Sequence, residues 1–325
     1  MALPMTSAAH PVQTLPPRLA GWAGAASGVS YVHERCNPVT AGLGPEILVT
    51  ALVHGNEYSG AIALAELLAC GWLPARGRVT GAFCNVAAFG RFDARLPDDS
   101  RFIDEDLNRV WSAQRLDSCQ RSVELDRARQ LRPFVDRASH LLDLHSMHEP
   151  CAPLLVTGNL QRNIDFAQSL QTASQVVVDA GHADGVRMRD YGGFSNPLGG
   201  RIALLLEAGQ HWDSRAVGVA RDTMMRFLIR AGACTRQQAP AGWLLPDAKP
   251  PAPIQVTGRI VATSMDFQFM QPFTGGETIA RAGTVIASDG GRPMVTPYDN
   301  CVLVMPSVRQ LRPGVTTVRL GRRAG

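Results

Sequence analysis

Two histidines and a glutamate stand just after apolar runs in this chain. His54 and Glu57 are separated by Gly and Asn, and His145 follows the pair Asp-Leu. The preceding runs, residues 47–53 and 141–144, are short and mostly apolar, as expected of buried strands. Two imidazoles and one carboxylate can hold Zn²⁺ and leave one coordination position open, which distinguishes a catalytic zinc site from a structural one. The spacing therefore predicts a catalytic zinc centre with one ion per chain.

Each half of this pattern is weak alone, because a lone His-x-x-Glu is usually a chance match. Together they are stronger, since ligands of open α/β sheets bind just outside the carboxyl ends of the strands. His148 is a rival ligand, but the strand-end position favours His145. Asp143 lies two residues before His145 and shares its face on a strand. It either accepts the second N–H of that imidazole or bonds backbone groups, and both interpretations stay open.

A zinc hydrolase also needs a group that accepts a proton from water and passes it to the leaving amine. Glu207 is the best candidate, because it ends the apolar run 202–206 and a carboxylate at the tip of a buried strand is costly unless it is paired or functional. An ion pair with an arginine is the structural alternative. Arg101 could polarise the scissile carbonyl, and Asn108 with Arg109 could bind a carboxylate, although each is more often a surface residue.

Strand-like and helix-like segments alternate through the first two thirds of the chain. Strands are expected at 47–53, 81–86, 141–144, 154–156, 176–178 and 202–206, and helices at 59–69, 122–137 and 222–231. Continuously apolar strands alternating with helices predict an α/β fold, with a mostly parallel or mixed sheet covered by helices on both faces.

A change of composition divides the chain. Residues 237–253 hold five prolines and read as a linker, and short β-type runs separated by Gly and Pro follow over 254–325. We therefore expect a catalytic domain over 1–236 and a small C-terminal all-β domain after the linker.

The bulk numbers exclude several classes of protein. The 325 residues are 45% hydrophobic and 18% charged, which predicts a packed core. A net charge of +4 with scattered arginines argues against nucleic-acid binding. Seven cysteines without a Cys-x-x-Cys pair fit a reducing compartment, and neither a secretory signal nor a transmembrane run is evident. The expected location is the cytoplasm, with no membrane or nucleic-acid partner; homo-oligomerisation stays open.

The motifs together resemble the succinylglutamate desuccinylase/aspartoacylase family, a branch of the zinc carboxypeptidase-like fold. The matching pieces occur in the family's order: His54-Gly55-Asn56-Glu57, Arg101, Asp106-Leu107-Asn108-Arg109, Asp143-Leu144-His145 and Leu206-Glu207-Ala208-Gly209. The resemblance implies that His54, Glu57 and His145 hold zinc and that Glu207 is the general base and acid. It further implies that Arg101 polarises the amide carbonyl, and that Asn108 and Arg109 bind the α-carboxylate of an N-acyl amino acid.

The chain departs from this family at one position. Aspartoacylase-like members place an arginine about ten residues before the catalytic glutamate, to grip a second substrate carboxylate, and this chain has Pro197 there. Arg187, Arg189 or Arg201 could substitute, so recognition of a second carboxylate stays open.

The resulting hypothesis is a zinc-dependent amidohydrolase that cleaves carbon–nitrogen bonds other than peptide bonds in small N-acyl amino acids. A metallocarboxypeptidase acting on peptides is the nearest alternative, and a C-terminal β-domain that narrows the cleft would argue against it. A non-catalytic protein that captures a small carboxylate is the alternative from another class. A nicotinamide-binding protein is disfavoured, because no Gly-x-Gly-x-x-Gly follows a strand.

Overall fold

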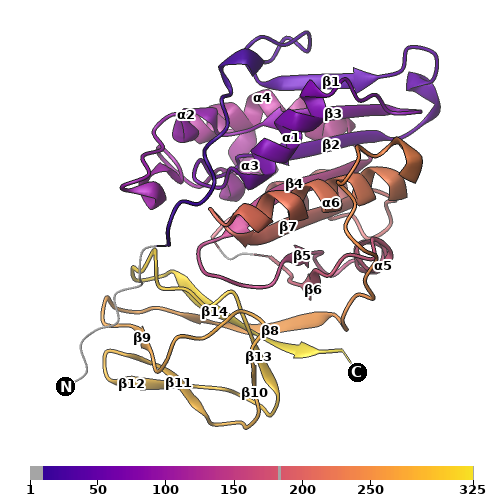
Figure 1. The fold of residues 1–325 in the computed structure, drawn as a ribbon. Helices are drawn as coiled ribbons and strands as arrows, with labels where there is room; N and C mark the ends of the chain where they lie inside the picture. The colour runs from indigo at the N-terminus through magenta and orange to yellow at the C-terminus, as the bar shows by residue number, and fades with distance from the viewer. Residues whose placement is uncertain (1–9, 182–183, 325) are drawn as a thin grey trace.

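The structure, a computed structural model, describes residues 10–181 and 184–324. The expectation that the N-terminus carries no signal falls partly on residues 1–9, outside the described residues. Figure 1 shows helices packed on both faces of a large sheet, with the C-terminal strands below them. The strands are β1 Val32–Cys36, β2 Glu46–Ala51, β3 Arg78–Phe83, β4 His140–Met147, β5 Leu154–Val156, β6 Gln175–Val178, β7 Ile202–Gln210, β8 Ile254–Val261, β9 Gln268–Phe269, β10 Thr278–Ile279, β11 Val285–Asp289, β12 Arg292–Val295, β13 Cys301–Val304 and β14 Thr316–Arg323. The α-helices are α1 Ser59–Ala69, α2 Val86–Phe89, α3 Ala113–Leu116, α4 Val123–Arg137, α5 Gln161–Ser169 and α6 Ser214–Arg230.

The large sheet is mixed. Its eleven strands run in the order β1-β3-β2-β4-β7-β5-β6-β8-β14-β13-β10. Strands β3, β2, β4 and β7 are parallel neighbours, whereas β5 pairs antiparallel with β7. A mixed sheet covered by helices, together with a second small β-sheet, confirms the fold class expected from the sequence.

Helices cover both faces of the central strands, so those strands are apolar on both sides. Leu142 and Leu144 of β4 pack in one hydrophobic core with α1 and α6, and Leu141 packs in the opposite core with α4. Alternate residues of a strand point to opposite faces, and burial of both faces explains why leucines occupy both faces of β4.

The C-terminal strands extend the same sheet. Strand β8 pairs in parallel with β6, and β14, β13 and β10 follow in antiparallel order. Strands β9, β11 and β12 form a separate three-stranded sheet. Strand β8 follows the irregular segment 239–253 in the chain but is hydrogen-bonded to β6, which precedes it. One sheet therefore includes strands from both sides of the expected linker, and the division into three parts stays a prediction about folding units.

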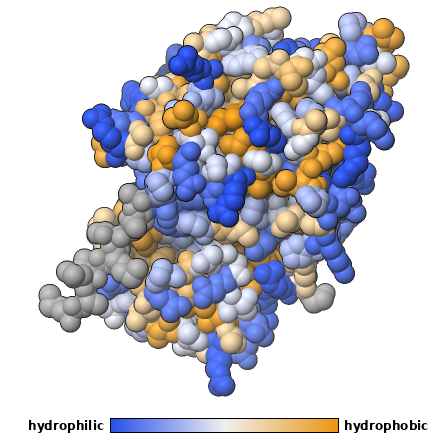
Figure 2. Space-filling model, viewed as in Figure 1, coloured by the Kyte–Doolittle hydropathy of each residue, from blue (hydrophilic) through white to orange (hydrophobic). Residues whose placement is uncertain are grey.

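Within the described residues, no helix is long and apolar enough to cross a membrane. On the face shown in Figure 2, hydrophilic side chains are interspersed with hydrophobic ones over both the helical part and the C-terminal strands.

Candidate metal centre and active site

A tight turn between β2 and α1 positions the first two candidate ligands. Strand β2 ends at Ala51, and the buried Leu52 then adopts a left-handed backbone with φ of 59°. A non-glycine residue in this region costs about 1 kcal/mol, so the surrounding packing must hold it. The Glu57 N–H donates to the His54 carbonyl at 3.2 Å and closes the turn just before α1 begins. His54 and Glu57 therefore lie together at the carboxyl end of β2.

Gly55 lets a second loop approach this turn. A Cβ at Gly55 would lie 2.3 Å from the carbonyl oxygen of Ser100 and 2.5 Å from the backbone nitrogen of Phe89. The Gly55 N–H donates to the carbonyl of Arg101 at 3.0 Å. Only glycine permits this close approach of backbones, which places the Arg101 loop beside His54.

The third candidate ligand and the candidate base lie on neighbouring strands. His145 of β4 is the direct parallel partner of Glu207 in β7. The sequence placed Glu207 at the tip of a strand ending at residue 206, but β7 continues to Gln210. That expectation is wrong in its boundary, since three more buried residues, 208–210, continue the strand. The carboxylate nevertheless lies in the same cavity as His145.

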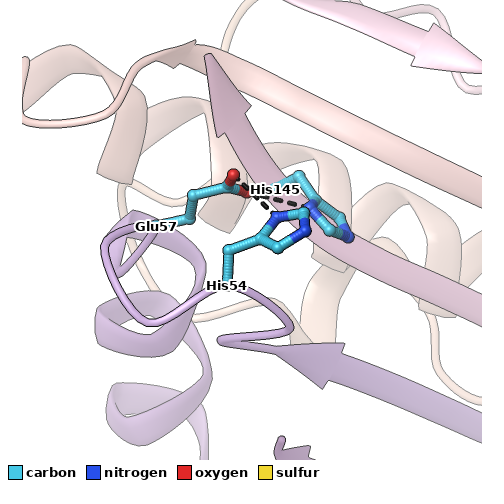
Figure 3. A group of neighbouring side chains, drawn as sticks. All are labelled: His54, Glu57 and His145. Carbon is cyan, nitrogen blue, oxygen red and sulfur yellow. Dashed lines mark hydrogen bonds and ion pairs between the residues drawn. The ribbon is translucent and has the colours of Figure 1, made fainter. Parts of the chain in front are cut away.

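The candidate ligand atoms of His54, Glu57 and His145 converge. One ligand atom from each of the three side chains lies within 4.8 Å of the others. Nδ1 of His54 lies 2.8 Å from one Glu57 oxygen, and Nδ1 of His145 lies 2.8 Å from the other (Figure 3). All three side chains are buried, and Figure 3 shows both rings turned toward the carboxylate. The rival ligand, His148, is not part of this group.

The outer nitrogen of each imidazole faces a further carboxylate. Nε2 of His54 lies 2.9 Å from Asp106 Oδ1, and Nε2 of His145 lies 2.9 Å from Asp143 Oδ2. The other oxygen of Asp143 accepts a 2.7 Å hydrogen bond from the Thr50 hydroxyl. A carboxylate behind each ring fixes its orientation and directs Nδ1 toward a shared point, as in many metal sites. Of the two interpretations left open for Asp143, the structure shows the contact with the imidazole.

Sequence reasoning missed the position of Asp106. Asp106 was considered only as part of the Asp106–Arg109 motif. A carboxylate that accepts the second N–H was expected for His145 but not for His54. The signal was present, because Asp106 follows Arg101 closely and precedes Asn108. Its distance of 52 residues from His54 hid the contact.

The charges around the rings favour a bound cation. Three buried or half-buried carboxylates surround two imidazoles: Glu57, Asp106 and Asp143. Burial would raise the pKa of Glu57, but His54 and His145 hold it well below its usual range. Burial would lower the pKa of His145, but Asp143 and Glu57 raise it well above its usual range. The donor set of two imidazole nitrogens and one carboxylate fits Zn²⁺, and its excess of negative charge suits a divalent ion.

Arg101 borders this centre. Its guanidinium donates to Glu57 Oε1 at 2.8 Å and lies 3.0 Å from Nε2 of His54. It also lies 3.6 Å from Asp106 Oδ2. The structure therefore places Arg101 within reach of any group bound at the three candidate ligands.

The environment of Glu207 suits proton transfer. The pKa of Glu207 is raised to about 8, mainly by burial and next by the neighbouring Glu57 carboxylate. Its Oε2 is buried and has no hydrogen-bond partner within residues 10–181 and 184–324. No arginine hydrogen-bonds to that oxygen in the described structure, which weakens the alternative of a structural ion pair.

Asn108 and Arg109 line the same cavity, whose volume is about 450 Å³. The Asn108 side-chain oxygen accepts a hydrogen bond from the Met188 backbone at 2.9 Å. The Arg109 guanidinium donates to the Asn108 carbonyl at 2.8 Å and lies 3.9 Å from Asp106. Both residues therefore line the cavity. The side-chain oxygen of Asn108 is already hydrogen-bonded to the backbone of Met188.

The three arginines considered as substitutes at Pro197 differ in position. Arg187 lines the cavity but bonds to Asp179 and Asp190. Arg189 is buried and donates to backbone carbonyls, and Arg201 lies over the Phe194 ring. Neither Arg189 nor Arg201 lines the cavity in the described structure.

A further cavity arginine comes from the C-terminal strands. Arg319 of β14 lines the cavity, and its Nε lies 3.1 Å from Asp179 Oδ2. Sequence reasoning could not have found it, because no local motif surrounds it.

His148 also lines the cavity. Its ring lies 4.8 Å from that of His211, and Nε2 of each ring has no hydrogen-bond partner in the described part of the chain. Burial lowers the pKa of both histidines, so both rings are neutral near pH 7. The structure thus places His148 beside the candidate ligands and not among them.

Comparisons with known proteins bear on the family and the fold of the chain. The model of the succinylglutamate desuccinylase/aspartoacylase catalytic domain matches residues 43–225, more than half of the chain. This segment contains the three candidate ligands and Glu207. A search of curated proteins found no match.

Solved structures share the fold at low sequence identity. A succinylglutamate desuccinylase from Vibrio parahaemolyticus is 19% identical, with a TM-score of 0.64 over 91% of this chain and 87% of that one. The ectoine utilization protein EutE (DoeB) from Ruegeria pomeroyi is 19% identical, with a TM-score of 0.63 over 86% and 85%. Murine aminoacylase 3 is 15% identical, with a TM-score of 0.60 over 86% and 95%. At these identities the likeness concerns the fold.

Proposed function

Because this chain belongs to the succinylglutamate desuccinylase/aspartoacylase family, a family of deacylases, we propose that it is a zinc-dependent amidohydrolase acting on small N-acyl amino acids. One observation carries the proposal. The ligand atoms of His54, Glu57 and His145 lie within 4.8 Å of one another, and Glu207 is paired with His145 across neighbouring strands. This combination supplies both a metal-binding group and a carboxyl for proton transfer in one cavity.

The three candidate ligands would hold the metal through Nδ1 of each histidine and the Glu57 carboxylate. A bound zinc ion supplies Lewis acidity, which acidifies water and polarises a carbonyl oxygen. The protein's own contribution is orientation, because Asp106 and Asp143 hold the two rings from behind.

Glu207 would transfer the proton. Its carboxylate accepts a proton from the attacking water as the new carbon–oxygen bond forms. It then donates this proton to the amide nitrogen as the carbon–nitrogen bond breaks, releasing a carboxylate and a free amine. Burial raises the pKa of Glu207, which favours the protonated carboxyl once the proton has been transferred to it.

Two arginines would orient the substrate. Arg101 lies beside Glu57 and His54, where its N–H groups can donate to the carbonyl oxygen as negative charge develops on it. Arg109, together with the Asn108 amide, lines the cavity and suits the α-carboxylate of an N-acyl amino acid. The proposed setting is the cytoplasm, which fits seven cysteines without a Cys-x-x-Cys pair.

The test is release of amine by the purified, zinc-loaded protein from N-acetyl, N-formyl and N-succinyl amino acids. We expect amine from at least one member of the panel, and no release from the matched panel of dipeptides with a free N-terminus. Cleavage of peptides alone would favour a metallocarboxypeptidase. Absence of all cleavage by protein that holds zinc would favour a non-catalytic carboxylate-binding protein.

A further inference from the structure

An apolar wall adjoins Glu207 inside the cavity. Leu205 lies two residues before Glu207 on β7, so both side chains point to the same face of the sheet. Val156 of β5 is the direct antiparallel partner of Leu205, and paired residues point to the same side. Both residues line the cavity and share one hydrophobic core. The part of the cavity wall beside Glu207 is therefore apolar.

The C-terminal part closes this wall. Cys151 forms an isolated parallel bridge with Gly275, and a Cβ at Gly275 would lie 2.3 Å from the Cys151 sulfur. Both residues line the cavity, as do Met147 and Met305. The segment after β9 thus lies directly against the loop after β4, and sulfur-containing residues from both parts line the cavity.

Met305 adopts an unfavourable backbone at this wall. Its φ is 50°, a left-handed conformation, and it precedes Pro306, which further disfavours helical conformations. Such a residue persists only where its surroundings hold it, and strain of this kind concentrates at ligand sites. Met305 lines the cavity, so this unfavourable backbone lies at a candidate ligand site.

The polar and the apolar lining residues of the cavity suit different parts of an N-acyl amino acid. Asn108 and Arg109 suit the carboxylate of the amino-acid part, which leaves the acyl substituent for the wall beside Glu207. A charged acyl group would lose hydration against these apolar side chains, whereas methylene groups gain by burial, and the cavity arginine Arg319 is already bound to Asp179. The nearby Arg187 is bound by Asp179 and Asp190.

We propose that Met147, Cys151, Val156, Leu205 and Met305 form an acyl-chain subsite that selects uncharged alkyl groups longer than acetyl. This inference rests on the proposed deacylase function and names its substrate class. It differs from recognition of a second carboxylate, the question left open at Pro197.

The experiment compares kcat/KM for the N-acetyl, N-butanoyl and N-succinyl derivatives of one amino acid. Burial of one methylene contributes about 0.8 kcal/mol, so each added methylene should raise kcat/KM about fourfold. Butanoyl should then exceed acetyl by roughly 15-fold, and succinyl should be the poorest of the three. Equal rates for acetyl and butanoyl, or a preference for succinyl, would overturn the acyl-chain subsite and leave the deacylase function standing. No amine from any of the three would overturn both.

Two variants test whether the preference for butanoyl over acetyl arises at the proposed subsite. Val156→Thr keeps the shape of the side chain and adds a hydroxyl facing the cavity, so the butanoyl-to-acetyl ratio should fall severalfold. Val177→Thr makes the same change at the parallel partner of Val156, in the same core but outside the cavity lining. Its ratio should equal that of the parent. A ratio that falls equally in both variants would mean that the core as a whole, and not the subsite, sets the preference.

Discussion

At the scale of single residues, the centre is organised by pairs of carboxylates and imidazoles. Each ring lies between Glu57 and a second carboxylate, Asp106 or Asp143. Without an ion, a ring must be protonated to donate to both carboxylates, as the raised pKa of His145 indicates. A cation bound by Nδ1 would take the place of the inner proton and leave the N–H at Nε2 for the outer carboxylate.

The role of Glu207 is tested at this scale by Glu207→Gln. The amide keeps the shape of the side chain but cannot accept a proton, so kcat should fall at least 100-fold while bound zinc stays unchanged. Turnover and metal content should be measured on the same sample. Glu66→Gln on the surface of α1 is the control, and it should match the parent in both. Parent-like turnover by Glu207→Gln would assign the proton transfer to another group.

At the scale of elements, α1 must lie very close to β4 to bring the two ligand segments together. A Cβ at Gly60 in α1 would lie 2.5 Å from Cβ of Leu144, the residue before His145. Gly60→Ala should therefore push the helix from the strand. We expect a loss of about 1–3 kcal/mol in the free energy of unfolding, together with weaker zinc binding.

The matched control for this substitution is Gly218→Ala in α6. No atom lies within 4 Å of a Cβ at Gly218, so the higher helix propensity of alanine should stabilise that variant by about 0.5–1 kcal/mol. Denaturant unfolding and zinc titration of both variants provide the readouts. A stabilised Gly60→Ala variant with normal zinc affinity would show that the contact is not critical.

A half-buried histidine at the start of β4 gives the protein a pH-dependent stability. Burial lowers the pKa of His140 to about 4, and its ring packs beside Phe166 and Phe227. The unfolded state takes up a proton near pH 6.5, before the folded state does, so stability should fall as the pH drops from about 6.5 to about 4. The loss from this group is on the order of 3 kcal/mol.

His140→Leu cannot bind this proton, so its free energy of unfolding should depend less on pH over the same window. Denaturant unfolding of both proteins at several pH values measures the difference. Identical pH dependence in the two proteins would contradict the prediction.

The sequence predicted the elements whose apolar pattern is strong. The expected helix at 59–69 and strand at 154–156 coincide with α1 and β5. Helix α5 was missed because only three of its nine residues are buried, which leaves little periodic signal. Helix α6 begins at Ser214 and not at 222, because Gly218 and three polar residues interrupt the apolar pattern over residues 214–221. Strand β12 has no clear apolar alternation in the sequence, because it is mostly exposed and contains Pro293.

The candidate site likewise includes residues that the sequence predicted and residues that it did not. Its three candidate ligands were predicted because each lies near the carboxyl end of an apolar run, although His145 lies inside β4 and not after it. The partnership of Asp106 with His54 and the arrival of Arg319 from β14 depend on loops and distant strands, for which no local pattern exists.

At the scale of the whole molecule, the C-terminal strands complete the cavity wall, and a buried charge cluster ties them to the catalytic part. Asp179 follows β6, and its carboxylate lies 3.2 Å from Arg187 and 3.1 Å from Arg319 of β14. Asp179→Asn keeps the shape but leaves both guanidinium groups without this counter-charge. We expect a loss of roughly 3 kcal/mol in the free energy of unfolding.

The control is Asp213→Asn, which removes an exposed ion pair with Arg215 and keeps a good N-cap residue for α6. It should change stability by less than about 1 kcal/mol. Equal effects of the two variants on thermal unfolding would show that the Asp179 cluster does not connect the two parts of the molecule.

The central claim is a catalytic zinc centre, and metal content tests it most directly. Purified protein should be loaded with zinc, freed of excess metal and analysed by plasma mass spectrometry beside His54→Ala, with His33→Ala as a histidine control outside the site. The account predicts about one zinc per chain in the parent and the control, loss of zinc in His54→Ala, and amine release that disappears with a chelator and returns with zinc. Absence of stoichiometric metal from the zinc-loaded parent would contradict it.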